Sequence, residues 1–326
     1  MTKIFYDDDA DPAVLEGASV AVVGYGNQGR SWALNLRDSG LDVTVCVRAD
    51  ETRAAAAEDG FEPADVGAAS TADVVCVLVP DDAIPTLELD RPPGGLTVVA
   101  SGYTLAFDRF TPQGDVGMIA PRMLGPEVRS CYEEGVGFIT AVGVQTDQTG
   151  EAWERLLAIA QAIGGLRQGA IELTPTQEAV LDLGVEQALS PALTHVNSTF
   201  VAVMMEHGIP IEAILCELVL SGEIERTYRL LRHEGFAGQL EHHSPTSQYG
   251  QLSRRGRFDH LDVVTTMREL VDDIADGRFA DEWDAEREAG HQGLAELKAA
   301  HAGPDIQAFE DDVRRRLGEG ALSRER

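Results

Sequence analysis

The feature that most constrains this chain is a glycine cluster between an apolar run and a helical pattern. Residues 19–23 are apolar and rich in valine, and residues 31–37 repeat apolar side chains at helical spacing before Gly40. Such a strand, tight turn and helix lets backbone N–H groups at the helix start face a pyrophosphate. A second β-branched run at residues 41–47 completes the unit within about 30 residues, so the pattern predicts a dinucleotide site and not only a structural turn. The candidate cofactor residues in the turn are Gly24, Tyr25, Gly26, Asn27, Gln28 and Gly29.

The end of the second predicted strand decides which dinucleotide fits. An acidic residue there receives the ribose hydroxyls of NADH, whereas a basic residue receives the 2′-phosphate of NADPH. Arg48 stands at this position and could bind a phosphate bidentately, with Thr52 and Arg53 as further partners. Asp50 and Glu51 would repel that phosphate. The sequence therefore favours NADPH narrowly and leaves NADH open.

Apolar runs and helical patterns divide the chain into two parts. Near-continuous apolar runs at residues 74–79, 97–100 and 116–120, separated by helix-length segments, predict a buried parallel sheet. Beyond about residue 168 the pattern has a period of about 3.6 residues, which predicts an all-helical part. We therefore expect an α/β Rossmann domain over residues 1–169 and an all-α domain over residues 170–326.

Several helix boundaries can be placed in the second part. Thr174 and Gln177 form a capping-box pattern with Pro175 at the first helical position. The helix that they open is expected to end near residue 208, with a break or kink at Pro191. Further helices are expected from residue 211 to about 233, at 261–274 and at 306–317.

The charge and apolarity of the chain exclude some partners. Asp and Glu number 55 against 26 Lys and Arg, and the excess is spread along the chain, which argues against nucleic acid binding. No stretch approaches the roughly 18 apolar residues that span a bilayer, and no signal segment is recognisable. We therefore expect a soluble, cytoplasmic protein without a membrane partner. The four scattered cysteines are expected to be reduced.

Several motifs together resemble one known family. Beyond the glycine turn, five segments fall in a single order: Val79-Pro80-Asp81-Asp82, Ala120-Pro121-Arg122, Ile163-Gly164-Gly165, Asp182-Leu183-Gly184-Val185-Glu186-Gln187 and Ser244-Pro245-Thr246-Ser247-Gln248-Tyr249-Gly250. This set resembles the ketol-acid reductoisomerases almost from end to end. The resemblance implies a Rossmann domain followed by a knotted helical domain, with active sites completed between two subunits of a homodimer or a higher homo-oligomer.

The resemblance also implies a reaction and its cofactors. In this family two magnesium ions promote an alkyl shift in an acetohydroxy acid, and NADPH then reduces the resulting keto group on the way to valine and isoleucine. The expected substrate is thus a small 2-keto or acetohydroxy acid. Pro80 and Asp81 match the cofactor segment, and Arg122, Glu223 and Ser244 match catalytic positions.

Two carboxylates suit a metal by their spacing. Asp182 and Glu186 lie four residues apart, so in a helix they project from one face and suit an oxygen-preferring cation such as magnesium. The same spacing is common on solvated surface helices, and by itself it favours that interpretation. With the family motif around the pair, we predict metal ligands at Asp182, Glu186 and Glu223.

The chain departs from the family pattern at several positions, among them Pro245 in place of an expected asparagine, and three of these departures bear on the metals and the proton transfers. Val219 stands where a second metal glutamate is expected four residues before Glu223, and Glu217 is a poor substitute in a regular helix. Ser101 replaces an expected histidine, while Arg122 replaces an expected lysine and does not readily give up a proton. The second metal and the proton transfers of the isomerisation are therefore open.

Three functions are compatible with these residues. The first is a ketol-acid reductoisomerase with an altered site. The second is a paralogue that only reduces another 2-keto acid or an imine, because reduction depends on the cofactor and needs less proton transfer. The third is a dinucleotide-binding subunit without activity. The intact cofactor half makes hydride transfer a safer prediction than isomerisation.

Overall fold

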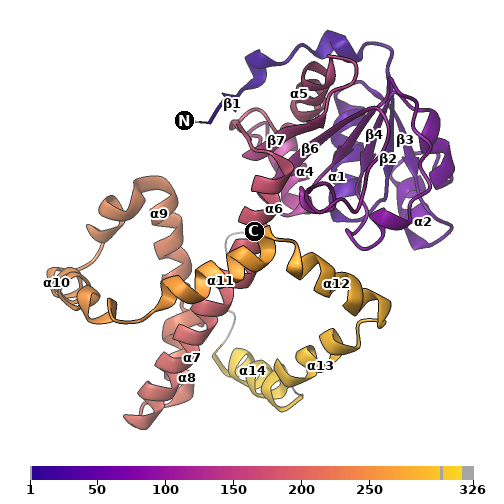
Figure 1. Ribbon diagram of the computed structural model, residues 1–326. Helices are drawn as coiled ribbons and strands as arrows, with labels where there is room; N and C mark the ends of the chain where they lie inside the picture. The colour runs from indigo at the N-terminus through magenta and orange to yellow at the C-terminus, as the bar shows by residue number, and fades with distance from the viewer. Residues whose placement is uncertain (1, 302–303, 318–326) are drawn as a thin grey trace. The chain divides into compact units, whose positions relative to one another are not determined.

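The computed structural model describes residues 2–301 and 304–317 and consists of two compact units, residues 1–183 and 184–326 (Figure 1). The last strand in the sequence and the helix that follows it belong to the first unit, because the residues up to 183 contact mainly one another. The domain boundary expected between residues 169 and 170 stays a prediction. None of the described helices combines the length and apolarity needed to cross a bilayer.

The first unit is built on an eight-stranded sheet with the order β1-β8-β7-β6-β5-β4-β2-β3. Neighbours from β3 through β2, β4 and β5 to β6 are parallel, as the apolar runs predict. The pairs β6·β7 and β1·β8 are antiparallel, which those runs did not predict. The strands are β1 (Ile4–Phe5), β2 (Ser19–Val23), β3 (Asp42–Cys46), β4 (Val74–Val77), β5 (Leu96–Val99), β6 (Asp115–Pro121), β7 (Thr140–Thr146) and β8 (Ala170–Glu172).

Both faces of this sheet are buried, because successive residues of β2 enter different cores. Val20 and Val22 pack with Trp32 and Leu36 of α1 (Asn27–Asp38) and with α5 (Ala152–Ala162). Ala21 and Val23 pack into the second core, which includes Leu105 of α3 (Tyr103–Ala106). The remaining helices of this unit are α2 (Glu51–Glu58), α4 (Gly125–Glu133) and α6 (Pro175–Gly184). The expected Rossmann-type α/β domain is confirmed.

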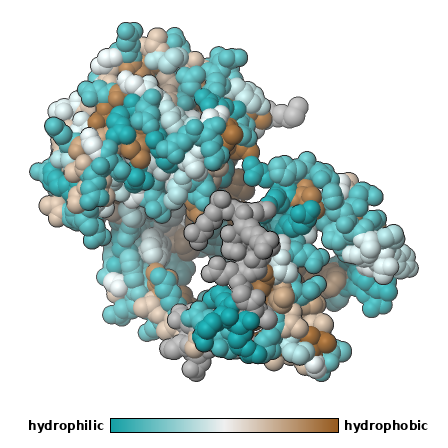
Figure 2. Space-filling view, turned by 180° about the vertical axis from the view of Figure 1, so that it is seen from behind, coloured by the Kyte–Doolittle hydropathy of each residue, from teal (hydrophilic) through white to brown (hydrophobic). Residues whose placement is uncertain are grey.

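The second unit is helical, as predicted. Its described α-helices are α7 (Ser190–Glu206), α8 (Ile211–Leu215), α9 (Glu223–Leu240), α10 (Pro245–Arg254), α11 (Val263–Ala275), α12 (Arg278–Glu288), α13 (Gln292–His301) and α14 (Pro304–Leu317). The knot that the resemblance implies stays a prediction. Figure 2 shows one face of the molecule, which is mostly hydrophilic, in keeping with 55 acidic against 26 basic residues.

Two predicted helix features are found, one as predicted and one in altered form. The capping box is confirmed: Thr174 N–H donates to Gln177 Oε1 at 3.0 Å, and Gln177 N–H donates to Thr174 Oγ1 at 3.1 Å. The break predicted at Pro191 takes the form of a π-helical segment, η5 (Val185–Leu189), before α7. A proline has no N–H to donate to the carbonyl four residues earlier, so a regular α-turn cannot be completed there.

The single helix expected from residue 211 to about 233 is wrong. α8 passes into a second π-helical segment, η6 (Cys216–Leu220), and α9 begins only after Gly222. Gly222 has a φ of 72°, a left-handed conformation that ends the preceding helix. Val219 and Glu223 therefore do not lie on one continuous helix.

Candidate functional site

The glycine turn between β2 and α1 is tight at two of its three glycines. Gly24 has a φ of 99°, and a Cβ atom there would lie 2.6 Å from Leu78 O. A Cβ atom at Gly29 would lie 2.3 Å from Gly24 O, so a side chain there would force the turn open. At Gly26, the N-cap of α1, no atom of the described residues lies within 4 Å of the Cβ position. The open space at the helix N-terminus is where a pyrophosphate can approach the backbone.

Two side chains of the turn serve the fold. Tyr25 is buried, and its hydroxyl donates to Asp59 Oδ2 at 2.9 Å. Burial and the neighbouring Asp59 carboxylate raise the pKa of Tyr25, which keeps the hydroxyl protonated as a donor. Gln28 Nε2 donates to Met123 O at 3.3 Å and so ties α1 to the loop after β6. The side chains of Tyr25 and Gln28, both predicted cofactor residues, thus make hydrogen bonds within the fold, whereas Asn27 is exposed at the start of α1.

The loop after β3 holds the residues that are predicted to discriminate between the two nicotinamide cofactors. Asp50 is the N-cap of α2: its Oδ1 accepts from Thr52 N–H at 3.1 Å and from the Thr52 hydroxyl at 2.6 Å. These hydrogen bonds, with Arg48 nearby, lower the pKa of Asp50. Arg48 Nε lies 3.6 Å from Asp50 Oδ2, and Arg53 is paired with Asp65 at 2.8 Å. Every basic or hydroxyl partner predicted for a 2′-phosphate therefore already faces a carboxylate.

A charged cluster lies beyond the carboxyl ends of β5 and β6. Arg122 follows β6, and its guanidinium contacts Glu178 Oε1 through Nη2 and Asp182 Oδ1 through Nη1, the latter at 3.3 Å. Glu178 is 2% exposed, and its other oxygen accepts from Gly102 N–H at 2.6 Å. Ser101, which stands in the expected histidine position, accepts from Tyr103 N–H at 3.2 Å. Pro80 opens the turn after β4 at the same edge of the sheet, since its carbonyl accepts from Ala83 N–H at 2.9 Å.

The residues predicted to hold metal and substrate fall on different elements. Asp182 is on α6, Glu186 is in η5 and Glu223 is the first residue of α9. The described residues contain no group of three or more His, Cys, Asp or Glu side chains arranged to hold a metal ion. Ser244 is the N-cap of α10, where its oxygen accepts from Ser247 N–H at 3.3 Å and its own proton remains available to a ligand.

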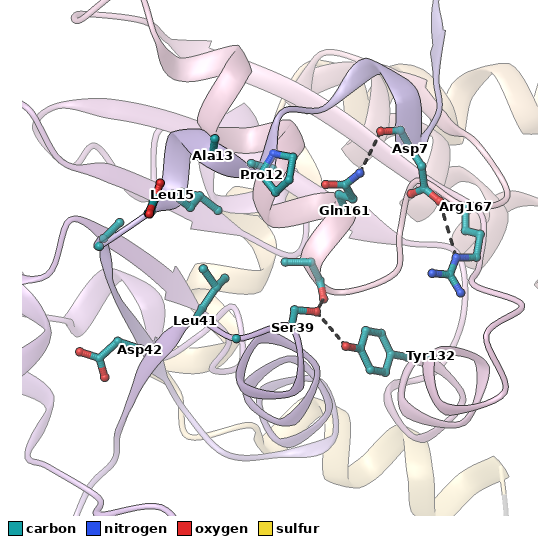
Figure 3. A pocket seen from close by; sticks show the side chains of 16 residues that line it. Asp7, Pro12, Ala13, Leu15, Ser39, Leu41, Asp42, Tyr132, Gln161 and Arg167 are labelled. Atoms are coloured by element: carbon teal, nitrogen blue, oxygen red, sulfur yellow. Dashed lines mark hydrogen bonds and ion pairs between the residues drawn. The ribbon is translucent and has the colours of Figure 1, made fainter.

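A hollow on the first unit lies away from this edge of the sheet. It has a volume of about 1050 Å³ and is lined by residues that precede β2 and β3, among them Ala18 and Leu41. Figure 3 shows Ser39 and Tyr132, two of the residues that line it, turned toward one another, and their hydroxyl oxygens lie 2.8 Å apart. The hollow is thus at the amino ends of the strands, opposite the glycine turn and apart from the predicted cofactor site.

Comparison with known proteins agrees with this arrangement. Residues 14–169 match the family model of the acetohydroxy acid isomeroreductase NADPH-binding domain, and residues 176–318 match that of the ketol-acid reductoisomerase C-terminal domain. This chain belongs to the ketol-acid reductoisomerase family. It is accordingly an oxidoreductase of that family.

Individual relatives cover nearly the whole chain. The ketol-acid reductoisomerase (NADP(+)) of Caldivirga maquilingensis is 36% identical over 98% of this chain and 100% of its own length. That of Methanocaldococcus jannaschii is 34% identical over 98% of this chain and 99% of its own length. A solved NADH-preferring ketol-acid reductoisomerase from an uncultured archaeal source superposes with a TM-score of 0.87 at 29% identity, covering 96% of this chain and 98% of its own.

The motifs in the sequence did not single out Glu178, which lies in the charged cluster around Arg122. It lies four residues before Asp182, so the same helical spacing that picked out Asp182 and Glu186 also pointed to it. Its environment could not be read from the sequence, because Gly102 N–H and Arg122 come from other loops. Gly102 was missed as well: a Cβ atom there would lie 2.2 Å from Pro175 O, so only glycine lets the loop after β5 contact α6.

Proposed function

We propose that this protein catalyses the complete ketol-acid reductoisomerase reaction, the isomerisation of an acetohydroxy acid followed by its reduction with NAD(P)H. The observation that carries the proposal is the charged cluster around Arg122, which lies at the same edge of the sheet as the glycine turn. Three strand spacings separate β2 from β6, or roughly 14 Å. An extended dinucleotide bound at Gly26 has its reactive end in reach of that cluster.

For the cofactor, we propose that the enzyme accepts both NADPH and NADH and that Asp50 sets their ratio. A 2′-phosphate must draw Arg48 and Thr52 away from Asp50, and it must approach a carboxylate. The two ribose hydroxyls of NADH can instead donate to that carboxylate. The loop therefore weakens the advantage that Arg48 alone would give to NADPH.

For the metal, we propose that Asp182, Glu186 and Glu223 supply carboxylate oxygens to magnesium. Such hard oxygen ligands are those that magnesium prefers. The residues present fit one ion better than two, since one oxygen of Asp182 is paired with Arg122 and Val219, at the position expected for a further ligand, cannot coordinate; Glu217 in η6 is the nearest carboxylate before it. A bound ion would polarise the oxygens of the substrate.

For the substrate, we propose that Arg122 and Ser244 hold polar oxygens of the acetohydroxy acid. Arg122 Nε is buried and has no hydrogen-bond partner among the described residues, although the side chain as a whole is 27% exposed. An arginine stays charged throughout the reaction, so its role is to orient and stabilise a developing negative charge. The Ser244 hydroxyl can donate its proton to a carboxylate or ketone oxygen while it caps α10.

For the assembly, we propose a homo-oligomer in which α7 is an interface. This helix has 17 residues, and none of them is buried by the part of the chain that the structure describes. Leu193, Val196, Phe200 and Val203 are each at least 42% exposed and recur at alternating spacings of three and four. That spacing is the seam along which two helices pack together. A second copy of the same chain offers a matching seam.

The proposal is tested with two substrates and two cofactors. Steady-state assays with 2-acetolactate, and separately with 3-hydroxy-3-methyl-2-ketobutyrate, are run with magnesium and either NADPH or NADH. We expect both substrates to oxidise the cofactor. Turnover of the second substrate alone would show a reductase without the alkyl shift, a possibility that Ser101 and Val219 motivate. No turnover of either, with the dinucleotide still bound, would exclude both activities.

A further inference from the structure

The Arg122 guanidinium bridges two carboxylates that lie one helical turn apart. Glu178 and Asp182 are four residues apart on α6 and therefore project from the same face of the helix. Arg122 approaches from the end of β6 and contacts both, Glu178 through Nη2 and Asp182 through Nη1. A planar guanidinium with several fixed donors can span two carboxylates in this way, whereas a lysine ammonium is a single point charge.

Glu178 fixes the arginine in place. Its side chain is 3% exposed, and its Oε2 accepts from Gly102 N–H at 2.6 Å, while its Oε1 faces Arg122. Gly102 itself is clamped against α6, because its Cβ position is 2.2 Å from Pro175 O. A buried carboxylate that is held by a backbone donor and by one cation cannot give up that cation without a large cost. Arg122 therefore stays where it is, next to Asp182.

The position of Arg122 alters what Asp182 can bind. Arg122 Nη1 lies 3.3 Å from Asp182 Oδ1, so a divalent ion bound to the Asp182 carboxylate would be repelled by the neighbouring guanidinium charge. The guanidinium does not lose its charge to relieve this repulsion. Independently, Val219 leaves an apolar side chain, 61% exposed, at the position where a second acidic ligand is expected, and the nearest carboxylate before it, Glu217, lies in the π-helical segment η6. The fixed charge of Arg122 is therefore the change that most directly lowers the capacity of Asp182 to bind a second metal ion.

We propose that Arg122 is a fixed cation that takes the place of one metal ion at Asp182, so that each chain binds one divalent ion and not two. Glu178 is the positioning residue that holds it. The inference rests on the proposed function for its meaning in catalysis. The number of ions bound is nevertheless independent of turnover, and the two can fail separately.

The test counts metal ions directly. Mn²⁺ is titrated into the full-length protein without substrate, and free Mn²⁺ is followed by electron paramagnetic resonance, with Mg²⁺ calorimetry as a second measurement. We expect one Mn²⁺ per chain in the wild type. In Arg122→Gln, a second ion is expected, or at least about tenfold tighter binding of the first, because a neighbouring positive charge is gone.

Two further variants keep the result interpretable. Arg278→Gln is the matched control, because Arg278 also bridges two carboxylates, Asp273 and Asp276, but on the exposed surface of α11 and α12. It should change neither the number nor the affinity of bound ions. Arg122→Lys keeps a positive charge for Glu178 but reaches only one carboxylate, so it should tighten Mn²⁺ binding even if Arg122→Gln fails to fold.

The outcomes separate this inference from the proposed function. Two tight Mn²⁺ ions per wild-type chain, or unchanged binding in both Arg122 variants, would overturn the fixed-cation role. One ion in the wild type and tighter binding in Arg122→Lys would support it, whether or not 2-acetolactate is turned over. Absence of turnover alone counts against the proposed function and leaves the metal count standing.

Discussion

Replacement of Gly26 by alanine should separate cofactor binding from stability. Within the described ranges, no atom lies within 4 Å of the Cβ position at Gly26, and the φ of −79° at this residue suits any side chain. Alanine should therefore fold normally, and a smaller loss of unfolded-state entropy should raise the free energy of unfolding by up to about 1 kcal/mol. A methyl group at the N-cap of α1 would, however, occupy the space that a pyrophosphate needs.

The expected loss of affinity can be estimated from the hydrogen bonds at stake. A backbone N–H that donates to a charged phosphate contributes about 1.5–3 kcal/mol, so losing one weakens cofactor binding by roughly 10- to 150-fold. Isothermal titration with NADPH and NADH gives the dissociation constants, and urea unfolding gives the stability. Gly67→Ala is the control, since its Cβ position is also open but lies outside the turn. Unchanged affinity in Gly26→Ala, at unchanged stability, would refute this placement of the pyrophosphate.

Three further predictions concern the cofactor loop, pH dependence and assembly. Asp50→Ser should raise the ratio of kcat/KM for NADPH to kcat/KM for NADH about tenfold, because it frees Arg48. The control Glu58→Ser, at the other end of α2, should leave this ratio unchanged. An unaltered ratio in Asp50→Ser would contradict the role of the Asp50 carboxylate. The pKa of Asp59 is lowered, with its hydrogen bond to Arg30 as the largest cause. The ionised Asp59 carboxylate therefore stabilises the folded state above about pH 4, the usual range of an aspartate, and this stabilisation is lost as the pH falls through the lowered pKa. The free energy of unfolding of Asp59→Asn should thus be lower than that of the wild type at pH 7, by about 1 kcal/mol or less after solvent screening. In acid unfolding curves this difference should vanish near pH 2. A difference that grows as the pH falls would contradict the stabilising role of the ionised Asp59. Val196→Asp should shift the mass measured by light scattering toward the monomer while Asn197→Asp does not, and equal masses would exclude α7 as the interface.

The order of elements was predictable because local patterns carry it. Residues 19–23 and the glycines after them specified a strand, a tight turn and a helix, and the structure has β2, the turn and α1 there. Thr174 and Gln177 specified a helix start through a reciprocal pair of hydrogen bonds between close neighbours. Such features depend on residues a few positions apart, which is why the sequence alone reveals them.

Other features depend on tertiary contacts or backbone conformations that local sequence patterns do not predict. The antiparallel placement of β7 next to β6 is a choice of tertiary pairing, and an apolar run looks the same in either direction. The helix break at Gly222 was not predicted because a glycine within a helical pattern does not by itself indicate a left-handed φ. Arg122 was expected as a substituted lysine, but its pairing with Glu178 and Asp182 joins residues 56 and 60 positions apart.

The identity of the product formed from 2-acetolactate tests the central claim most directly. The protein is incubated with 13C-labelled 2-acetolactate, magnesium and NADPH, and the product is identified by nuclear magnetic resonance while cofactor oxidation is followed. We expect 2,3-dihydroxy-3-methylbutanoate, with its methyl group migrated, in a one-to-one ratio with oxidised cofactor. An unrearranged diol, or cofactor that stays reduced, would contradict the claim that this chain carries out both steps.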